Sequence, residues 1–380
     1  MRLLFFMDLM IFGGCEKMII EITKELLKKG YQIELLLIYK SKDNTYLQML
    51  DSRIAVRYLW NKEIASNIRK RLRYWINVLF PKYILKNFDF SRYDLVINFK
   101  DDYQTNILSS NINCNKVSWI HNINQKYRDI EKTGIKYKLA NILYKYVDKK
   151  YYNSFSLFNE VICVSNHAKN SLLQNTSANI RTSVIYNYID YKDICSLSKK
   201  NIKDISFNEF TFCYLGRLSA EKGVLELMNI FSKIPYSLNY KLLIIGEGYL
   251  ERKMKEMITI GNKNKIIFLS PKTNPYPYIL NSDVVICPSH RESFGLTVLE
   301  SILLKTMIVS TKCGGPEEII KNGYNGFLVN DYNEMKDKLI DLLKIGKKKY
   351  NLDIEEYMKL QESFYSNLNI ILEKYSRKEL

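Results

Sequence analysis

Two glutamates eight positions apart, Glu292 and Glu300, flank the predicted start of a helix. A β-branched run ends at Pro288, a turn containing glycine follows, and a helical pattern begins near Phe294. Glu292 then lies in the loop, and Glu300 lies about 9 Å along the helix axis. The first N–H groups of such a helix attract an anion. A ligand with both phosphate and hydroxyl groups would engage all three features, although solvated glutamates at this spacing are also common on surface helices.

Two cations follow another predicted strand, which begins at Phe210. This strand leads Arg217 and Lys222 into a loop, and Val224 begins the next helix. Positive side chains beside a helix N-terminus suit a diphosphate group. A Gly-x-Gly turn that begins at Gly246 ends a further strand and is typical of nucleotide contact, with weak specificity.

The first half of the chain offers two more candidates. Gly13 and Gly14 follow the first predicted strand, and a helix over 17–29 completes a βα pair. The third glycine of a dinucleotide fingerprint is missing, which argues against a nicotinamide site. His121 ends a predicted strand at the edge where open α/β sheets bind ligands. A lone histidine is more often structural, so both interpretations stay open.

The pattern Pro-Ser-x-x-Glu-Ser-Phe-Gly-Leu-x-x-x-Glu over 288–300 resembles the donor-site motif of the retaining glycosyltransferases of family four, which have the GT-B fold. The resemblance implies that Glu292 contacts the donor sugar and that Glu300 binds the ribose. Arg217 and Lys222 match the family's diphosphate-binding pair. In this family a strand often ends on a histidine that enters the cleft beside the donor sugar, which is the role implied for His121.

The resemblance therefore implies a complete set of site residues. The implied catalytic residues are His121, Glu292, Arg217 and Lys222. The implied donor-binding residues are Gly13, Gly14, Arg217, Lys222, Gly246, Glu292, Ser293, Phe294, Gly295, Leu296 and Glu300. The segment 183–190 departs from the family, because Tyr186 and Tyr188 replace the usual proline and glycine, so the backbone there could differ.

A chain of 380 residues is too long for one ordinary core and fits two domains. Strands and helices alternate in both halves, which predicts an α/β protein with two Rossmann-like doubly wound domains facing across a cleft, the GT-B arrangement. We expect an acceptor-binding domain over 1–188, a nucleotide-sugar-binding domain over 189–360, and a C-terminal helix within 361–380 that returns to the first domain. The polar stretch 191–208 is the expected linker.

The positive charge is concentrated in the first half. Residues 1–188 hold 29 Lys and Arg against 16 Asp and Glu, and the rest holds 28 against 24. The segment 66–86 has basic and aromatic residues at helical spacing and no acid, and 136–152 is a similar Lys/Tyr-rich pattern. Such helices can lie on an anionic membrane surface, or they can face the core of the protein. Net charge is the only feature of the sequence that favours a nucleic-acid partner, so no such partner is expected.

The remaining composition indicates a cytoplasmic protein, with peripheral attachment to the inner face of the cell membrane as an option. The seven cysteines are scattered, as expected in a reducing compartment. Asp8 interrupts the apolar stretch from Leu3, which we interpret as a buried strand rather than a signal peptide. No Asp-x-Asp occurs, and Asp101 and Asp102 have the wrong spacing, so no metal and no cofactor is expected.

The expected reaction is a metal-independent, retaining glycosyl transfer. The donor would be a nucleotide sugar, with a UDP-sugar favoured, and the acceptor a hydroxyl of a glycan or lipid-linked oligosaccharide in bacterial capsule or lipopolysaccharide synthesis. Two alternatives share the fold: a non-catalytic sugar-nucleotide-binding partner of a transferase, and a sugar-nucleotide epimerase. An epimerase would convert the donor without an acceptor, and a binding protein would leave it unchanged.

Overall fold

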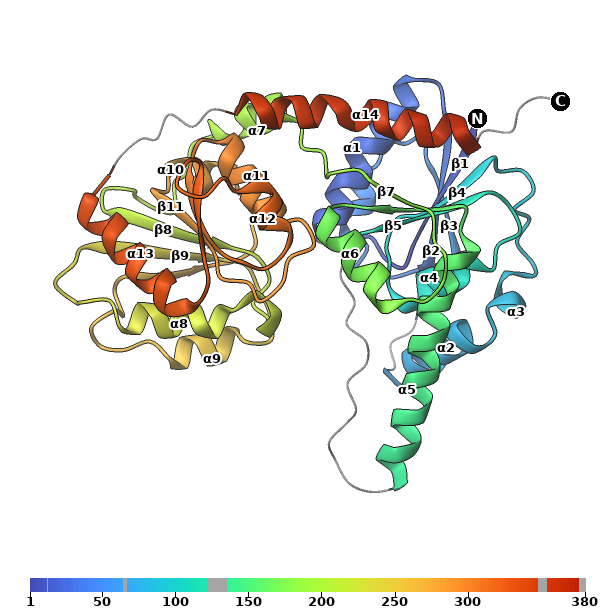
Figure 1. The fold of residues 1–380 in the computed structure, drawn as a ribbon, viewed down its shortest axis with the longest axis horizontal. Coiled ribbons are helices and arrows are strands. Elements are labelled where there is room, and N and C mark those ends of the chain that lie inside the picture. The colour runs from blue at the N-terminus through green and yellow to red at the C-terminus, as the bar shows by residue number, and fades with distance from the viewer. Residues whose placement is uncertain (12, 64–66, 122–134, 348–353, 376–380) are drawn as a thin grey trace. The chain divides into compact units, whose positions relative to one another are not determined.

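The computed structural model describes residues 1–11, 13–63, 67–121, 135–347 and 354–375. It divides into two compact units (Figure 1). Unit 1 comprises Met1–Asn187 together with Phe364–Leu380, and unit 2 comprises Tyr188–Ser363. Each unit is built around its own parallel β-sheet.

The sheet of unit 1 has seven strands in the order β3-β2-β1-β4-β5-β6-β7, and every pair is parallel. Its central strands are continuous apolar runs, as expected when both faces of a parallel sheet are covered. Residues 3–7 of β1, for example, are all buried. The strands are β1 (Arg2–Met7), β2 (Gln32–Tyr39), β3 (Ala55–Trp60), β4 (Leu95–Asn98), β5 (Lys116–Ile120), β6 (Glu160–Cys163) and β7 (Thr182–Val184).

Helices cover both faces of this sheet (Figure 1). The helix α1 lies on one side, and α2, α4 and α5 lie on the other. The helical elements of unit 1 are α1 (Gly14–Lys28), η1 (Thr45–Met49), α2 (Asn67–Leu79), α3 (Pro81–Leu85), α4 (Tyr103–Ser110), α5 (Ile135–Ser154), η2 (Phe155–Leu157) and α6 (Asn166–Asn175).

One detail of unit 1 differs from the sequence-based expectation. The segment 66–86 does not form one helix, because Pro81 has no N–H to continue α2 and instead occupies the first position of α3. Elsewhere in unit 1, the N-cap of α6 is Ser165, whose hydroxyl accepts a hydrogen bond from the N–H of Ala168.

Unit 2 repeats the same plan with six strands in the order β10-β9-β8-β11-β12-β13, again all parallel. Within this unit, α8 and α9 lie on one side of the sheet, and α10 and α11 lie on the other (Figure 1). The strands are β8 (Phe210–Leu215), β9 (Tyr240–Ile245), β10 (Ile266–Leu269), β11 (Val284–Cys287), β12 (Met307–Thr311) and β13 (Gly326–Val329). The helical elements are α7 (Tyr191–Ser198), η3 (Ala220–Lys222), α8 (Val224–Ser232), α9 (Glu251–Glu256), α10 (Tyr276–Asn281), α11 (Leu296–Leu303), α12 (Gly315–Ile319) and α13 (Tyr332–Ile345).

The expected linker over 191–208 is only partly irregular. Asp190 caps α7 by accepting a hydrogen bond from the N–H of Asp193, and the helix continues to Ser198. The polar composition concealed this short helix, although an aspartate at the cap position is a helix-start signal.

The last helix, α14 (Glu355–Tyr375), is shared between the units. Its first part belongs to unit 2, where the Tyr357 hydroxyl donates to the carbonyl oxygen of Ile319 at 2.6 Å. Its second part belongs to unit 1, where the ring of Phe364 stacks on Trp119 with centroids 6.1 Å apart. The predicted C-terminal helix that returns to the first domain is confirmed.

In each sheet the strand order reverses beside the first strand, between β1 and β4 in unit 1 and between β8 and β11 in unit 2. The loops after these strands diverge to opposite faces and leave room for a ligand at the carboxyl edge. We call these two places the switch points of unit 1 and unit 2. The fold thus directs attention to the loops that follow β1, β4, β8 and β11.

Candidate active site

The switch point of unit 2 brings together the loops after β8 and β11. Gly223 has a left-handed backbone, with φ +64°, and a Cβ at this position would lie 1.9 Å from the carbonyl oxygen of Pro288. Only glycine allows so close an approach. The loop with the two cations is thereby pressed against the start of the loop with Glu292.

Lys222 and Glu292 meet at this point. The Lys222 Nζ lies 2.7 Å from Glu292 Oε1, and the Ser289 hydroxyl donates a hydrogen bond to the same oxygen, also at 2.7 Å. The backbone of Glu292 is held as well, because its N–H donates to the Cys313 carbonyl at 2.7 Å and its carbonyl accepts from the Gly315 N–H at 2.8 Å. The two charged side chains remain 21% and 16% exposed, so a ligand can reach them.

Arg217 is held much more loosely. Its side chain is 70% exposed and pairs with Glu221 at 3.0 Å. An exposed pair of this kind contributes about 0.3–0.5 kcal/mol, so the guanidinium can turn to a better anion at little cost. Gly246 lies beside this loop: a Cβ there would be 1.9 Å from the carbonyl oxygen of Gly216. The loop after β9 can therefore approach the Arg217 loop only with glycine at this position.

The helix that follows Glu292 begins at Leu296, two residues later than expected, because Gly295 is its N-cap residue. Its first turn has N–H groups without partners inside the helix, as every helix does. Glu300 is on this helix, about 6 Å from its start along the axis, and is only 7% exposed. Ser293 and Phe294 lie in the loop just before it, and Phe294 is buried.

The switch point of unit 1 has a different composition. Lys100, which follows β4, places its ammonium group between two carboxylates, 2.8 Å from Asp8 Oδ1 and 3.0 Å from Glu16 Oε1. The Glu16 side chain is only 4% exposed. Burial lowers the pKa of Lys100, but Asp8 and Glu16 more than offset this effect, and the net shift is upward. Burial raises the pKa of Glu16, against the effect of Lys100.

Two further carboxylates follow Lys100. Asp101 is fully buried and accepts a hydrogen bond from the N–H of His121 at 3.1 Å. Asp102 caps α4 by accepting from the N–H groups of Gln104 and Thr105. Burial, together with the charge of Asp8, raises the pKa of Asp102 to about 7.

The predicted site residues of the first half lie around this cluster. Gly13 has an extended backbone, and a Cβ there would lie 2.4 Å from Glu16 Oε2, so the glycine makes room for the buried carboxylate. Gly14 begins α1. His121 is 8% exposed, and its ring packs against Phe99 and Trp119. Within the described part of the chain, no hydrogen-bond partner reaches its Nε2.

His121 is neutral at ordinary pH. Burial, and then the positive charge of Lys100, lower the pKa of its imidazole to about 3. The structure therefore brings Lys222, Glu292, Gly246 and Arg217 to one switch point, whereas Gly13, Gly14 and His121 lie at the other. That any of these residues binds the donor, or takes part in catalysis as His121 was expected to do, stays a prediction.

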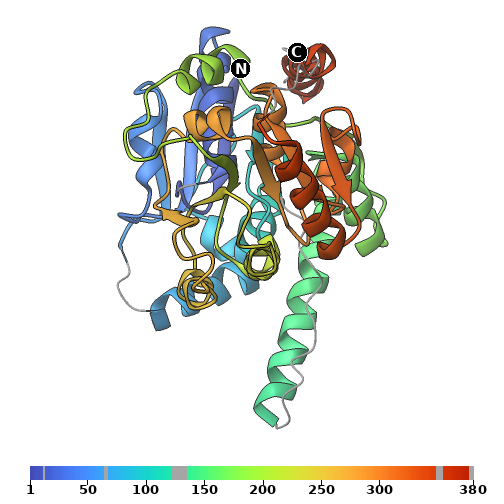
Figure 2. The same cartoon turned by 90° about the vertical axis from the view of Figure 1, so that its left-hand side faces the viewer.

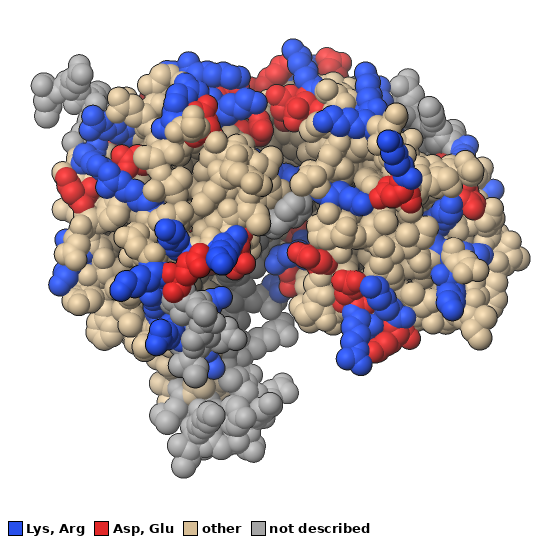
Figure 3. All heavy atoms as spheres, turned by 180° about the vertical axis from the view of Figure 1, so that it is seen from behind, with Lys and Arg blue, Asp and Glu red and all other residues tan. Residues whose placement is uncertain are grey.

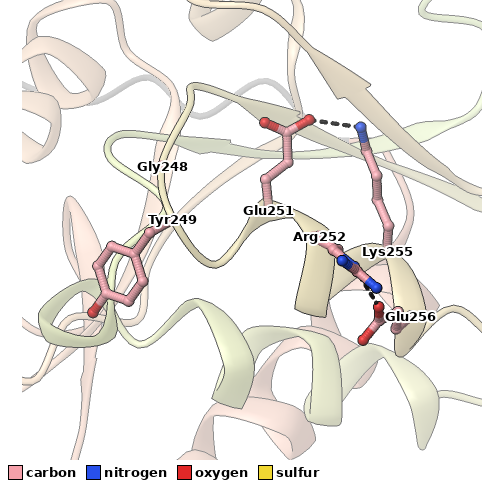
Figure 4. A pocket seen from close by; sticks show the side chains of 6 residues that line it. All are labelled: Gly248, Tyr249, Glu251, Arg252, Lys255 and Glu256. Atoms are coloured by element: carbon pink, nitrogen blue, oxygen red, sulfur yellow. Dashed lines mark hydrogen bonds and ion pairs between the residues drawn. The ribbon is translucent and has the colours of Figure 1, made fainter.

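An open pocket in unit 2 lies along α9 and is drawn in Figure 4. Its charged side chains are engaged with one another, Glu251 with Lys255 at 2.6 Å and Arg252 with Glu256 at 3.0 Å. Tyr249, at the other side of the pocket, accepts a hydrogen bond from the Ala220 N–H. These four charges form exposed i,i+4 pairs typical of a solvated helix face, so we place the candidate site at the switch point instead.

Sequence reasoning missed several of the residues that meet at the two switch points. Ser289 could have been found, because it stands three positions before Glu292 in the motif. Lys100, Asp8 and Glu16 had a weaker signal, which is that each follows a strand flanking the reversal of the sheet. Nothing in the residue types alone indicates that these three side chains meet.

Two further searches concern only the described residues. No group of three or more His, Cys, Asp or Glu side chains in these ranges lies together in a way that could hold a metal ion. Among the helices of the same ranges, none has the length and apolarity that are needed to cross a membrane.

Two parallel α/β units with charged loops at their switch points define a GT-B protein, and comparisons with known families agree. A family model described as Glycosyltransferase Family 4 matches residues 12–193, and one described as Glycosyl transferases group 1 matches residues 198–360. Together these models cover both units. The chain belongs to the glycosyltransferases of family four, with the GT-B fold, and the resemblance in the motif of residues 288–300 is confirmed.

Curated relatives and solved structures are consistent with this assignment. The chain is 29% identical over 213 residues to an uncharacterized glycosyltransferase of Methanocaldococcus jannaschii. The matched stretch covers 54% of this chain and 56% of that protein. It is 28% identical over 192 residues to the N-acetyl-alpha-D-glucosaminyl L-malate synthase of Bacillus anthracis. This match covers 48% of this chain and 50% of that protein. The chain thus spans about half the length of these relatives.

Among solved structures, Anabaena HepE in complex with UDP and glucose has a similar fold, with a TM-score of 0.71 at 19% identity. The match covers 97% of this chain and 99% of HepE. At this identity the likeness supports the fold. The predicted GT-B class is confirmed over nearly the whole chain.

Proposed function

We propose that this protein is a metal-independent, retaining glycosyltransferase (a hexosyltransferase) that uses a nucleotide-diphosphate sugar, with a UDP-sugar favoured. The sugar would be moved to a hydroxyl of a glycan or lipid-linked oligosaccharide in bacterial surface polysaccharide synthesis, such as capsule or lipopolysaccharide. We further propose a cytoplasmic location, peripheral on the inner face of the cell membrane. The observation that carries the proposal is the Lys222–Glu292 pair at the switch point of unit 2.

The charges at this point suit a leaving diphosphate. When the bond between the sugar carbon and the phosphate oxygen breaks, negative charge accumulates on the diphosphate. Lys222 is fixed by Glu292, whose carboxylate also accepts a hydrogen bond from Ser289, and it offers a preorganised ammonium group. Arg217 is exposed and can close on the ligand. The N–H groups at the start of α11 add further donors. Binding of UDP by HepE, as stated for that structure, supports this choice of ligand.

The other residues of the site receive supporting roles. Glu292 holds hydroxyl groups of the donor sugar, and Glu300 holds the ribose. A new bond forms between the sugar carbon and the acceptor oxygen on the face that the diphosphate leaves, and the acceptor proton passes to the departing phosphate. No side chain has to act as a nucleophile in this scheme. His121, being neutral, orients the sugar or the acceptor through its Nε2.

A first experiment identifies the donor. Thermal unfolding is measured with a panel of nucleotide sugars, because a ligand that binds only the folded state raises the melting temperature. The proposal expects UDP-sugars to stabilise the protein most. A labelled donor is then followed with and without acceptor. Transfer supports the proposal, conversion of the donor without acceptor indicates the epimerase alternative, and an unchanged donor indicates a binding protein.

A second experiment tests the site. Arg217→Ala, Lys222→Ala and Glu300→Ala should each weaken use of the donor strongly, whereas Lys233→Ala, on the exposed end of α8, should not. If the three site variants keep wild-type turnover, the site is wrong.

A further inference from the structure

Two buried cysteines lie beside the loop that holds Glu292, and the transfer scheme uses neither of them. Cys287 is the last residue of β11 and is 7% exposed, and Cys313 follows β12 and is 4% exposed. The two strands are neighbours in the sheet, and Cys287 pairs with Ser310 of β12. Figures 1 and 2 show this part of unit 2 in orange. In the sequence the seven cysteines are scattered, so the fold alone brings these two together.

The two thiol groups contact each other and the hydroxyls around them. The Cys313 thiol donates a hydrogen bond to the Cys287 sulfur, which lowers the pKa of Cys287 and raises that of Cys313. The Ser310 hydroxyl lies 3.9 Å from Cys313 Sγ, and the Cys287 thiol donates to the Ser289 hydroxyl across 3.7 Å. Cys287 is therefore the thiol of the pair that ionises first, and the thiolate is the nucleophilic form of cysteine.

Each cysteine is one contact away from Glu292. The carbonyl of Cys313 accepts a hydrogen bond from the Glu292 N–H at 2.7 Å, and so fixes the backbone of the glutamate. The Cys287 thiol reaches the side chain instead, because the Ser289 hydroxyl to which it donates is the one that donates to Glu292 Oε1, at 2.7 Å. A change at either sulfur thus acts on the residue that pairs with Lys222.

The segment after Cys313 also packs closely against the start of α11. Gly314 has φ +108°, a conformation that favours glycine and leaves the backbone free to adjust. Gly315 packs tightly, because a Cβ there would lie 2.3 Å from the Cα of Phe294. Phe294 directly precedes Gly295, the N-cap residue of α11. A shift of Cys313 is therefore passed on to the N–H groups that begin this helix.

A disulfide between the two cysteines would cause such a shift. The S–S bond is about 2.05 Å long, which is much shorter than the separation of two hydrogen-bonded thiols. Bond formation draws Cys313 toward the end of β11 and removes the proton that Cys287 gives to Ser289. Both connections to Glu292 change as a result, one through the backbone and one through the side chain.

We propose that Cys287 and Cys313 form a redox modification site, and that their disulfide weakens donor binding by displacing Glu292 and the start of α11. The inference rests on the proposed function, because it assigns the effect to the donor site in unit 2. Buried cysteines can also serve as small apolar side chains. That alternative gives no role to the contact between the thiols or to the two connections to Glu292.

The oxidant that we assign is hydrogen peroxide. The Cys287 thiolate attacks one peroxide oxygen, the O–O bond breaks, and a sulfenic acid and water form. The Cys313 sulfur then attacks the Cys287 sulfur, the S–O bond breaks, and the disulfide and a second water form. Two electrons pass from the sulfurs to the peroxide, and a dithiol reductant returns them when it restores both thiols.

A small neutral oxidant suits this place. The two cysteines are buried, so a bulky oxidant would not reach them, whereas peroxide is little larger than water. On the face drawn in Figure 3, basic and acidic side chains are interspersed over both units. That face therefore offers no patch of one sign to guide a charged protein oxidant. Disulfides in a reducing compartment, such as the one proposed for this protein, are mostly transient and redox-sensing.

The first test uses the full wild-type chain. The protein is oxidised with hydrogen peroxide, the excess is removed, and a digest without reductant is analysed by mass spectrometry. We expect a peptide pair that links Cys287 to Cys313 and separates on addition of dithiothreitol. Affinity for UDP, measured by thermal unfolding, should fall by about tenfold to a hundredfold and recover on reduction, since hydrogen bonds to charged groups are lost.

Three variants separate this pair from the other cysteines. Cys287→Ala and Cys313→Ala should each lose the reversible response to peroxide. Cys213→Ala is the matched control, because Cys213 is equally buried in the same sheet and its thiol bonds to Ser282. The control should respond like the wild type. Each oxidised variant is compared with its own reduced form, so a change in basal affinity or stability cancels.

Three outcomes would overturn the proposal: no linked peptide after oxidation, a linked peptide with unchanged affinity for UDP, or the same reversible loss in Cys313→Ala as in the wild type. The first of these would leave the cysteines with a packing role only. Absence of stabilisation by UDP in the reduced wild type counts against the proposed function instead. The linked peptide, which needs no ligand, then still decides whether the modification site exists.

Discussion

Both switch points of this protein hold a lysine paired with carboxylates, but they differ in the ratio of cations to carboxylates and in the exposure of the cations. In unit 1 a single ammonium group, that of Lys100, is enclosed between Asp8 and Glu16, and its side chain is 17% exposed. In unit 2, Lys222 meets one carboxylate, and the second cation, Arg217, is 70% exposed. The first arrangement neutralises its cation inside the protein. The second leaves positive charge within reach of a ligand.

This difference indicates how one fold supports two kinds of site. A cation shared by the buried Glu16 and the partly exposed Asp8 cannot bind a diphosphate without leaving those carboxylates unpaired. Lys100 therefore fixes the loop after β1 to the end of β4. At the other switch point, the loosely paired Arg217 can change partner cheaply. We expect anions to bind in unit 2, and four variants sharpen this contrast.

The largest effect is expected for Lys100→Met. The substitution leaves Glu16 buried without its cation, and removal of one partner from a buried ion pair costs about 3–5 kcal/mol. Denaturant unfolding should show a loss of this order. Lys40→Met, at an exposed position after β2, serves as the control. A loss below about 0.5 kcal/mol, the range of ordinary surface substitutions, would show that unit 1 does not depend on this pair.

Lys222→Met should act on turnover instead. Removing one preorganised donor to a developing charge lowers the rate by about 10² to 10³, whereas stability should change by about 1 kcal/mol or less for this partly exposed pair. The rate is measured with the donor found by thermal unfolding, and Lys233→Met is the matched control. A stability loss as large as that of Lys100→Met, with turnover intact, would reverse the roles of the two lysines.

The third effect depends on pH and concerns His121. Its pKa is about 3 in the folded protein and about 6.5 in the unfolded chain. Between these values the unfolded state binds the proton, so the free energy of unfolding falls by up to about 1.4 kcal/mol per pH unit as the pH drops below about 6.5. Above pH 7 this group has no effect. His121→Phe should lack this part of the slope, and unfolding measured from pH 7 to pH 4.5 compares the two proteins. Identical slopes would mean that His121 is not buried in its neutral form.

The smallest effect is expected for Ser289→Ala. The variant removes one hydrogen bond to Glu292, a contribution of about 0.5–1.5 kcal/mol. Since Lys222 still holds the carboxylate, we expect a few-fold rise in the KM for the donor and little change in stability. Ser196→Ala, at an exposed position on α7, is the control. If Ser289→Ala behaves like the control in donor titrations, Ser289 does not help to position Glu292.

The sequence supports prediction of the fold because the signals are long and local. Apolar runs such as 3–7 and the alternation with helices define two parallel sheets without reference to distant contacts. The meeting of Lys222 and Glu292, 70 positions apart, followed from the family motif and not from periodicity. Pro81 shows a signal that was present but given too little weight, since proline inside a helical pattern predicts a break.

The cluster around Lys100 could not be predicted in the same way. Lys100 and Glu16 are 84 positions apart, and a lysine after a strand has no property that distinguishes an enclosed ammonium group from a solvated one. The distinction arises only when α1 brings Glu16 to the end of β4. Likewise, the apolar stripe of 66–86 was compatible with both membrane and core, because helical spacing identifies a face and not what covers it.

The division of α14 between the units bears on the order in which the protein can fold during its synthesis. Unit 1 is built from two separate stretches of the chain. Glu160, which is 4% exposed, lies in the first stretch, whereas its ion-pair partner Lys374 and the Tyr375 hydroxyl that donates to it lie in the second. The unit translated first therefore lacks part of its packing until Tyr375 has left the ribosome. Unit 2, which is continuous along the chain, has all of its residues available earlier and can be the first to reach its final form.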